Sequence, residues 1–230
     1  MTSSLITYAS FSDRASAEQA IVVSIREQLL GAIEARKQAT FGVCGGKTAK
    51  AIFPILTSMK IDWKKIHILL IDDRWVDPSA DQSNEALIRQ ELLSGFATPA
   101  AFTPLKTAHS CPSEALATLE RRLAPFPFPL DSVFVSMGTD GHIASLFPGG
   151  RENLEDDATV VATTAIEEPI ERISLSPRVL AAARHGTIAV LGEQKRQVFN
   201  QAQKSGDPMK YPVCHMLQPH GNPREIFFSP

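Results

Sequence analysis

The chain alternates short runs of branched apolar residues with longer segments whose apolar residues recur every three or four positions. A run such as residues 66–71 is typical of a strand that is buried on both faces. The pattern over residues 16–38 is typical of an amphipathic helix, and Ser16 with Gln19 forms a candidate capping box at its start. Alternating strands and helices predict βαβ units with right-handed crossovers. We therefore expect an α/β fold: a doubly wound, mostly parallel sheet flanked by helices on both faces (Rossmann-like).

Length and composition narrow the class of protein. The 230 residues suit a single α/β domain, residues 1–230. Hydrophobic residues make up 43% of the chain, but no apolar run approaches the ~18 residues of a membrane span, so we expect no membrane association. The start of the chain lacks the basic and apolar regions of a signal peptide, which predicts a cytoplasmic protein. We expect a monomer or a small homo-oligomer.

Charge and cysteine usage exclude further classes. The net charge is -2 and no block of Lys and Arg stands out, so we expect no nucleic-acid partner. An anionic ligand must then be held by a few well-placed cations rather than by a global field. The three cysteines are scattered and odd in number, and the six histidines show no metal-ligand spacing. We therefore expect neither a disulfide framework nor a metal site.

Polar motifs follow four of the predicted strands. The carboxyl ends of parallel strands meet at one edge of a sheet, and ligands of such sheets bind there. The four motifs are therefore expected to converge on one rim. They are Gly45-Gly46-Lys47-Thr48, Asp72-Asp73-Arg74, Gly138-Thr139-Asp140-Gly141-His142 and Gly192-Glu193-Gln194-Lys195.

The first motif is a candidate anion site. Gly45 and Gly46 permit a sharp turn and a close approach to a ligand, and the helix that follows directs free N–H groups toward it. A phosphate suits this place, next to Lys47 and Thr48; the alternative is an ordinary strand-to-helix connection. The nucleotide-binding Gly motifs are absent, so neither ATP nor NAD is expected.

Pro54 is expected to bend or interrupt the helix that follows the Gly-Gly turn, unless it lies in the first turn of that helix.

His142 is the leading candidate for chemistry, because it follows a Gly-rich turn at a strand end. An unperturbed imidazole, with a pKa of ~6.5, is available as a base near neutral pH. Asp140 could hold one ring nitrogen and leave the other to take a proton from water. The alternative is a purely structural histidine. Ser145 has no evident activating partner and no nucleophile-elbow motif is present, so water is the expected nucleophile.

Charged residues of the other motifs are candidate ligand contacts. Arg74 could clamp a phosphate or carboxylate with its planar guanidinium, while Asp72 could orient Arg74 or bind sugar hydroxyls. For Asp73 the favoured interpretation is structural, with an Asp-Arg pair bracing the loop that runs to Asn84. Lys195 could add a cation to a phosphate site, although most lysines are simply solvated.

The motifs together resemble the 6-phosphogluconolactonases, within the wider group that includes the glucosamine-6-phosphate deaminases. The segment "SMGTDGHIASLFPG" at residues 136–149 is similar to the family pattern GMGxDGHxASLFPG, and "CGGKTAKAIF" to its Ser-Gly-Gly-Ser-Thr-Pro turn. The resemblance extends from about residue 41 to the end of the chain. Its other segments are "IDDRWVDPSADQSNEALIRQELL", "ERISLSPRVLAAARHGTIAVLGEQK" and "YPVCHML".

This resemblance implies hydrolysis of 6-phospho-D-glucono-1,5-lactone to 6-phosphogluconate in the oxidative pentose phosphate pathway, without a metal or organic cofactor. It implies that His142 activates water and that Asp140 supports it. The implied partner is thus a small phosphosugar lactone. The residues implied to bind it are Gly45, Gly46, Thr48, Arg74, Arg172 and Lys195.

The Gly-Gly turn departs from the family pattern. Cys44, Lys47 and Ala49 stand where Ser, Ser and Pro are usual, and Asp73 replaces Glu in the Asp-Glu-Arg segment. Without the two serine hydroxyls, the turn lacks two possible hydrogen-bond donors to a phosphate. The positive charge of Lys47 could compensate for this loss.

Two other functions are alternatives to lactone hydrolysis. In the deaminases the Asp-Gly-His turn is followed by Ala-Phe-Asn-Glu-Pro, whereas Phe147 stands here in place of that carboxylate, which disfavours deamination. A sugar-phosphate sensor that binds without turnover is the second alternative. Such a protein would normally carry a DNA-binding segment, and no helix-turn-helix pattern precedes the first predicted strand.

Overall fold

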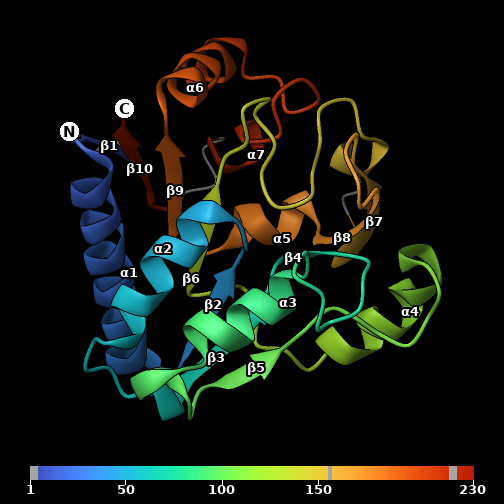
Figure 1. Ribbon diagram of the computed structural model, residues 1–230, viewed down its shortest axis with the longest axis horizontal. Helices are drawn as coiled ribbons and strands as arrows, with labels where there is room; N and C mark the ends of the chain where they lie inside the picture. Colours follow the sequence, from blue (N-terminus) through green and yellow to red (C-terminus); the bar gives the residue numbers. More distant parts are fainter. Residues whose placement is uncertain (1–4, 155–156, 218–221) are drawn as a thin grey trace.

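A single large sheet, in which every neighbouring pair of strands is parallel, runs through the molecule (Figure 1). The structure is a computed structural model that describes residues 5–154, 157–217 and 222–230. The predicted parallel sheet is confirmed. In spatial order its strands are β1 (Ile6–Ser10), β10 (Arg224–Ser229), β9 (Gly186–Leu191), β6 (Ser132–Ser136), β2 (Ala39–Val43), β3 (Ile66–Leu70) and β5 (Ala101–Thr103).

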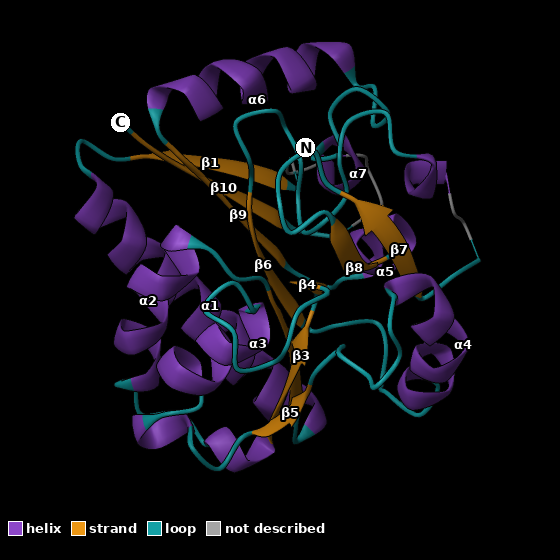
Figure 2. Ribbon diagram, turned by 45° about the vertical axis from the view of Figure 1, so that its right-hand side comes forward, coloured by secondary structure: helices purple, strands orange, loops and turns teal. Residues whose placement is uncertain are grey.

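Helices cover both faces of this sheet. Figure 2 shows α1, α2 and α3 to one side of it, and α4 and α7 to the other. None of the helices in the described ranges is long and apolar enough to cross a membrane. Their bounds are α1 (Arg14–Arg36), α2 (Lys47–Thr57), α3 (Asn84–Leu87, continued by a π-helical turn, Ile88–Leu92), α4 (Pro112–Leu123), α5 (Pro177–Ala182), α6 (Glu193–Ser205) and α7 (Cys214–Leu217).

A second, antiparallel sheet stands beside the carboxyl edge of the first. It consists of β4 (Asp72–Arg74), β8 (Glu171–Leu175) and β7 (Val160–Thr164), in the order β4-β8-β7. The residues after Leu70 therefore begin a short strand of their own instead of merely ending a buried one. Ile71 makes the junction, because its N–H donates to Val43 of the large sheet while its carbonyl accepts from Leu175 of the small one.

The start of α1 differs from the sequence-based expectation. The N-cap is Asp13, whose carboxylate accepts hydrogen bonds from the backbone N–H of Ser16 at 2.9 Å and from its hydroxyl at 2.8 Å. The predicted capping box of Ser16 and Gln19 was therefore wrong: Ser16 is a donor to the cap and lies inside the first turn. An ionised carboxylate is the stronger acceptor for these free helix donors.

Pro54 does not interrupt its helix, so this part of the expectation was wrong. It lies inside α2, on the exposed side, and the helix continues to Thr57. The carbonyl of Lys50, which a residue with an N–H at position 54 would have bonded, belongs to an exposed residue, so water can satisfy it.

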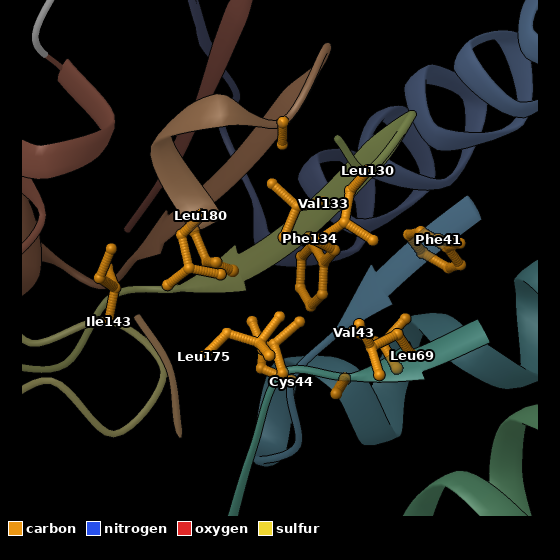
Figure 3. Close-up of a cluster of buried hydrophobic side chains, with 14 of the residues drawn as sticks. Phe41, Val43, Cys44, Leu69, Leu130, Val133, Phe134, Ile143, Leu175 and Leu180 are labelled. Carbon is orange, nitrogen blue, oxygen red and sulfur yellow. The ribbon is translucent and has the colours of Figure 1, made fainter. Parts of the chain in front are cut away.

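The core lies where the strands of the large sheet meet the small sheet and α5. Figure 3 shows Phe41, Val43 and Phe134 from neighbouring strands, with Leu175 of β8 and Leu180 of α5 closing the cluster. These side chains are fully buried. Phe134 also meets Phe53 of α2 edge-on, with 6.3 Å between ring centroids. The core thereby joins the large sheet, whose strands precede three of the polar motifs, to the small sheet, whose strand β4 is the fourth motif.

We expect Phe134→Ala to lower the free energy of unfolding by about 3–5 kcal/mol, because a large buried ring would be replaced by a cavity. Urea denaturation followed by circular dichroism measures this change. Phe96→Ala is the matched control, since the Phe96 side chain is 57% exposed and should change stability by less than about 0.5 kcal/mol. Equal effects of the two substitutions would contradict the assigned core.

Candidate active site

A cleft of about 650 Å³ opens at the carboxyl ends of the central strands, between the large and small sheets. Each of the four polar motifs contributes to it, and β8 adds a side chain from the small sheet. Every site residue named from the sequence lies on its wall. These are Gly45, Gly46, Lys47, Thr48, Asp72, Arg74, Asp140, His142, Arg172 and Lys195.

Asp140 and His142 form a hydrogen-bonded pair in the turn after β6. The Nδ1 atom of His142 lies 2.6 Å from Oδ1 of Asp140, and the same oxygen accepts the backbone N–H of His142 at 3.1 Å. Burial raises the pKa of Asp140, but the hydrogen bond and charge of His142 outweigh burial, and the pKa is lowered. An ionised Asp140 accepts the Nδ1 proton, so the neutral ring carries its lone pair on Nε2.

Glycines shape this turn for steric reasons. A Cβ at Gly138 would overlap the Cε1 and Nδ1 atoms of His142, so the imidazole lies directly over the glycine. Gly141 has a φ of +90°, and its carbonyl accepts the N–H of Val213 at 3.0 Å. The segment around Tyr211 and Val213 therefore supports the turn from behind, a role that the sequence did not indicate.

The Phe147 ring packs between two candidate site residues, His142 and Arg172. Its ring centroid lies 5.1 Å from that of His142 and 5.9 Å from the guanidinium carbon of Arg172. The chain returns toward the cleft through Ala144, which takes a left-handed φ of 49°. The imidazole is thus held by a carboxylate at one nitrogen and by an aromatic ring at its face.

Asp72 is buried at the back of the cleft. Its Oδ2 accepts the hydroxyl of Ser145 at 2.8 Å, whereas its buried Oδ1 has no hydrogen-bond partner among the described residues. Burial raises the pKa of Asp72, against the bond from Ser145 and the charges of Arg74, Arg172 and His142. The expected lack of a partner for Ser145 was therefore wrong, but Ser145 is fully buried and does not line the cleft, so its hydroxyl does not face a ligand there.

Asp73 has a structural position, but the expected Asp-Arg pair was wrong, because the Arg74 guanidinium bonds Asn84 and only the backbone N–H of Arg74 donates to Asp73. Its carboxylate accepts the N–H groups of Arg74, Asn84 and Glu85 and the hydroxyl of Ser83, at 2.6–3.1 Å. Burial nevertheless raises the pKa of Asp73 to about 6. Asp73 thereby fixes the start of α3 against β4.

Asn84 joins the arginine to the Gly-Gly turn. Its Oδ1 accepts Nη1 of Arg74 at 2.6 Å, and its Nδ2 donates to the carbonyl of Asp72 at 2.9 Å. A Cβ at Gly45 would overlap this Oδ1, so the turn and Asn84 are in close contact. Asn84 lines the cleft but was not identified as a site residue from the sequence. Its position in the Ser-Asn segment was the available signal.

The Gly-Gly turn is surrounded by cations. Gly46 has a φ of +93° and precedes the first turn of α2. Burial lowers the pKa of Lys195, and the nearby charges of Arg14 and Lys47 lower it further. Arg14 reaches the cleft from α1 and was missed, because a lone Arg at a helix start carries no motif. Burial raises the pKa of the Cys44 thiol in this turn to about 12, so it stays neutral.

Within the described ranges, no group of three or more His, Cys, Asp or Glu side chains could hold a metal ion. Among the other histidines, His220 falls outside the described residues.

We expect Gly138→Ala to displace the His142 ring and to break its bond to Asp140, because the added methyl group would occupy the same space. Imidazole nitrogen NMR should lose the signature of a hydrogen-bonded Nδ1 proton. Gly31→Ala is the control, since a Cβ at Gly31 meets no atom within 4 Å. An unchanged His142 signal in a folded Gly138→Ala protein would contradict this packing.

Comparison with known proteins places the chain in a family. Residues 12–224 match the family model described as glucosamine-6-phosphate isomerases/6-phosphogluconolactonase. A 6-phosphogluconolactonase of Rhizobium meliloti is 35% identical, covering 96% of this chain and 97% of that protein. The crystal structure of a 6-phosphogluconolactonase from Shewanella baltica superposes with a TM-score of 0.93 at 36% identity, covering 98% of each chain. The chain therefore belongs to the glucosamine-6-phosphate isomerase/6-phosphogluconolactonase family.

Proposed function

We propose that this protein hydrolyses 6-phospho-D-glucono-1,5-lactone to 6-phosphogluconate, in the oxidative pentose phosphate pathway, with His142 as the general base. The observation that carries the proposal is the Asp140–His142 pair, which faces a cleft that also holds five cationic side chains. Relatives that match nearly the full chain at 30–35% identity are named 6-phosphogluconolactonase, which supports the same reaction.

The chemistry follows from Nε2 of His142, the ring nitrogen that the bond of Nδ1 to Asp140 leaves with the lone pair. Nε2 accepts a proton from water, and the resulting hydroxide attacks the lactone carbonyl carbon. The tetrahedral intermediate collapses with cleavage of the bond to the ring oxygen, which takes the proton back from the imidazolium. The new carboxylic acid then ionises to solvent, so water is the only co-reactant. Asp140 holds the ring in one tautomer and stabilises the imidazolium.

We infer the orientation of the substrate from the positions of the charged residues in the cleft. Arg74 and Arg172 lie near His142 and the buried Asp72. These arginines therefore bind the sugar acid and provide positive charge near the alkoxide that develops on the carbonyl oxygen. The phosphate binds at Gly45 and Gly46, where the N–H groups at the start of α2 lie next to the cationic side chains of Lys47 and Lys195.

Deamination of an amino-sugar phosphate is the main alternative, because the family model includes both activities. Phe147 packs on His142 here, so this side of the imidazole has an apolar neighbour and no carboxylate to tune proton transfer. The solved structure of a monomeric glucosamine-6-phosphate deaminase, with a TM-score of 0.82 at 10% identity, shares the fold alone. The contact to Phe147 favours lactone hydrolysis.

Residues 1–230 are proposed to act as one domain, because the large and the small sheet each supply a wall of the cleft. The cytoplasmic location and the monomeric or small homo-oligomeric state remain predictions.

His142→Ala should reduce lactone hydrolysis to the spontaneous rate, a loss of about 10²–10⁴-fold, because no base remains to activate water. Binding of 6-phosphogluconate should stay measurable. A coupled assay with freshly generated lactone, corrected for background hydrolysis, measures the rate. His109→Ala is the control, since the His109 ring bonds Thr107 outside the cleft. Full activity of His142→Ala would remove this residue from the mechanism. Binding of 6-phosphogluconate by the unmodified protein without lactone hydrolysis would favour a sugar-phosphate sensor.

Lys195→Ala should raise KM for the phosphorylated lactone about 10-fold or more, because a charged hydrogen bond to phosphate is lost. KM for unphosphorylated gluconolactone should stay nearly constant. Lys204→Ala, an exposed change on the same helix, serves as the control. An equal rise of KM for both lactones would exclude a phosphate contact at Lys195.

A further inference from the structure

Three cations from three separate helices converge on the Gly-Gly turn. Lys47 opens α2, Lys195 lies in the first turn of α6, and Arg14 lies in the first turn of α1. All three line the cleft, and the charges of Arg14 and Lys47 both act on Lys195. In the described part of the chain, neither lysine has a carboxylate within 4 Å of its ammonium group. Like charges gathered in this way favour an anion between them.

Arg14 is oriented before any ligand arrives. Its Nε donates to Glu18, one turn further along α1, at 2.8 Å, and its Nη2 donates to the hydroxyl oxygen of Thr48 at 3.3 Å. These two contacts restrain the guanidinium through Nε and Nη2. The Arg14 side chain remains 45% exposed, which leaves it accessible to a ligand in the cleft.

These contacts fix the direction of the Thr48 hydroxyl. Thr48 Oγ1 accepts from Arg14 and also from the hydroxyl of Ser136, at 3.4 Å. A hydroxyl has two lone pairs and one proton, so with both lone pairs engaged it can act only as a donor. Thr48 lies in the first turn of α2 and lines the cleft. Its proton is therefore available to a group that only accepts hydrogen bonds, such as a phosphate dianion.

We propose that Arg14 is a binding residue of this protein: it adds a third cation to the phosphate site and holds the Thr48 hydroxyl as a donor. This inference rests on the proposed function for the identity of the phosphosugar. It also explains how the Gly-Gly turn can bind phosphate although Cys44 and Lys47 replace the two serines of the family pattern. The site binds phosphate mainly through charge, so its affinity should fall steeply as salt is added.

Two measurements test the proposal: calorimetric binding of inorganic phosphate and of 6-phosphogluconate, and KM for unphosphorylated gluconolactone. Arg14→Gln should weaken both about 10-fold, while KM for unphosphorylated gluconolactone stays unchanged. Arg14→Lys, which restores the charge but not the planar fork, should recover part of the loss. A double-mutant cycle of Arg14→Gln with Thr48→Val should be non-additive, because Arg14 acts partly through Thr48.

Arg121→Gln is the matched control, because Arg121 also donates to a threonine hydroxyl, that of Thr118 at 3.2 Å, but lies on the exposed face of α4, outside the cleft. It should leave both affinities unchanged. Unchanged phosphate affinity in Arg14→Gln, or an equal loss for unphosphorylated gluconolactone, would overturn the proposal. If the unmodified protein binds phosphate through Arg14 but does not hydrolyse the lactone, the proposed function fails while the role of Arg14 stands.

Discussion

The parallel pairing of four central strands is the constraint on which the site depends. Strands β9, β6, β2 and β3 are neighbours in that order, and all point the same way. Each is followed by a polar motif, so segments from residue 45 to residue 195 meet along one edge. A reversal of any one strand would move its motif to the opposite edge, about 15–20 Å away for a strand of five residues. The backbone hydrogen bonds of the sheet thus set the composition of the cleft.

The cleft contains groups that would lower the stability of an ordinary protein surface. Cations lie close together at the Gly-Gly turn, and Asp72 keeps a buried oxygen without a hydrogen-bond partner in the described residues. Ala144 adopts a left-handed backbone that suits glycine better. Each of these features costs stability, and the buried core around Phe134 offsets them. Their concentration in one place is typical of a site built for a ligand.

The sequence predicted the parallel sheet and the meeting of its polar motifs, because strand periodicity and the geometry of βαβ units are local and general properties. It did not predict β4 as a separate antiparallel strand, since residues 66–74 read as one continuous apolar run with a polar end. That division depends on the hydrogen bonds of Ile71 to two different sheets. Arg14, Asn84 and the support of Gly141 by Val213 were missed for the same reason, because each depends on tertiary contact. The capping of α1 was missed because Asp13, three residues before Ser16, supplies the acceptor for the N–H and hydroxyl of Ser16.

The proposed function requires that the imidazole of His142 and the Gly-Gly turn bind opposite ends of one phosphosugar acid. A crystal structure of the protein with bound 6-phosphogluconate tests this arrangement. We expect phosphate oxygens at hydrogen-bond distance from the Gly46 turn and Lys195, with the carboxylate about 3 Å from Nε2 of His142, or one water molecule away. A ligand bound in the reverse direction, with its phosphate against His142, would exclude this arrangement.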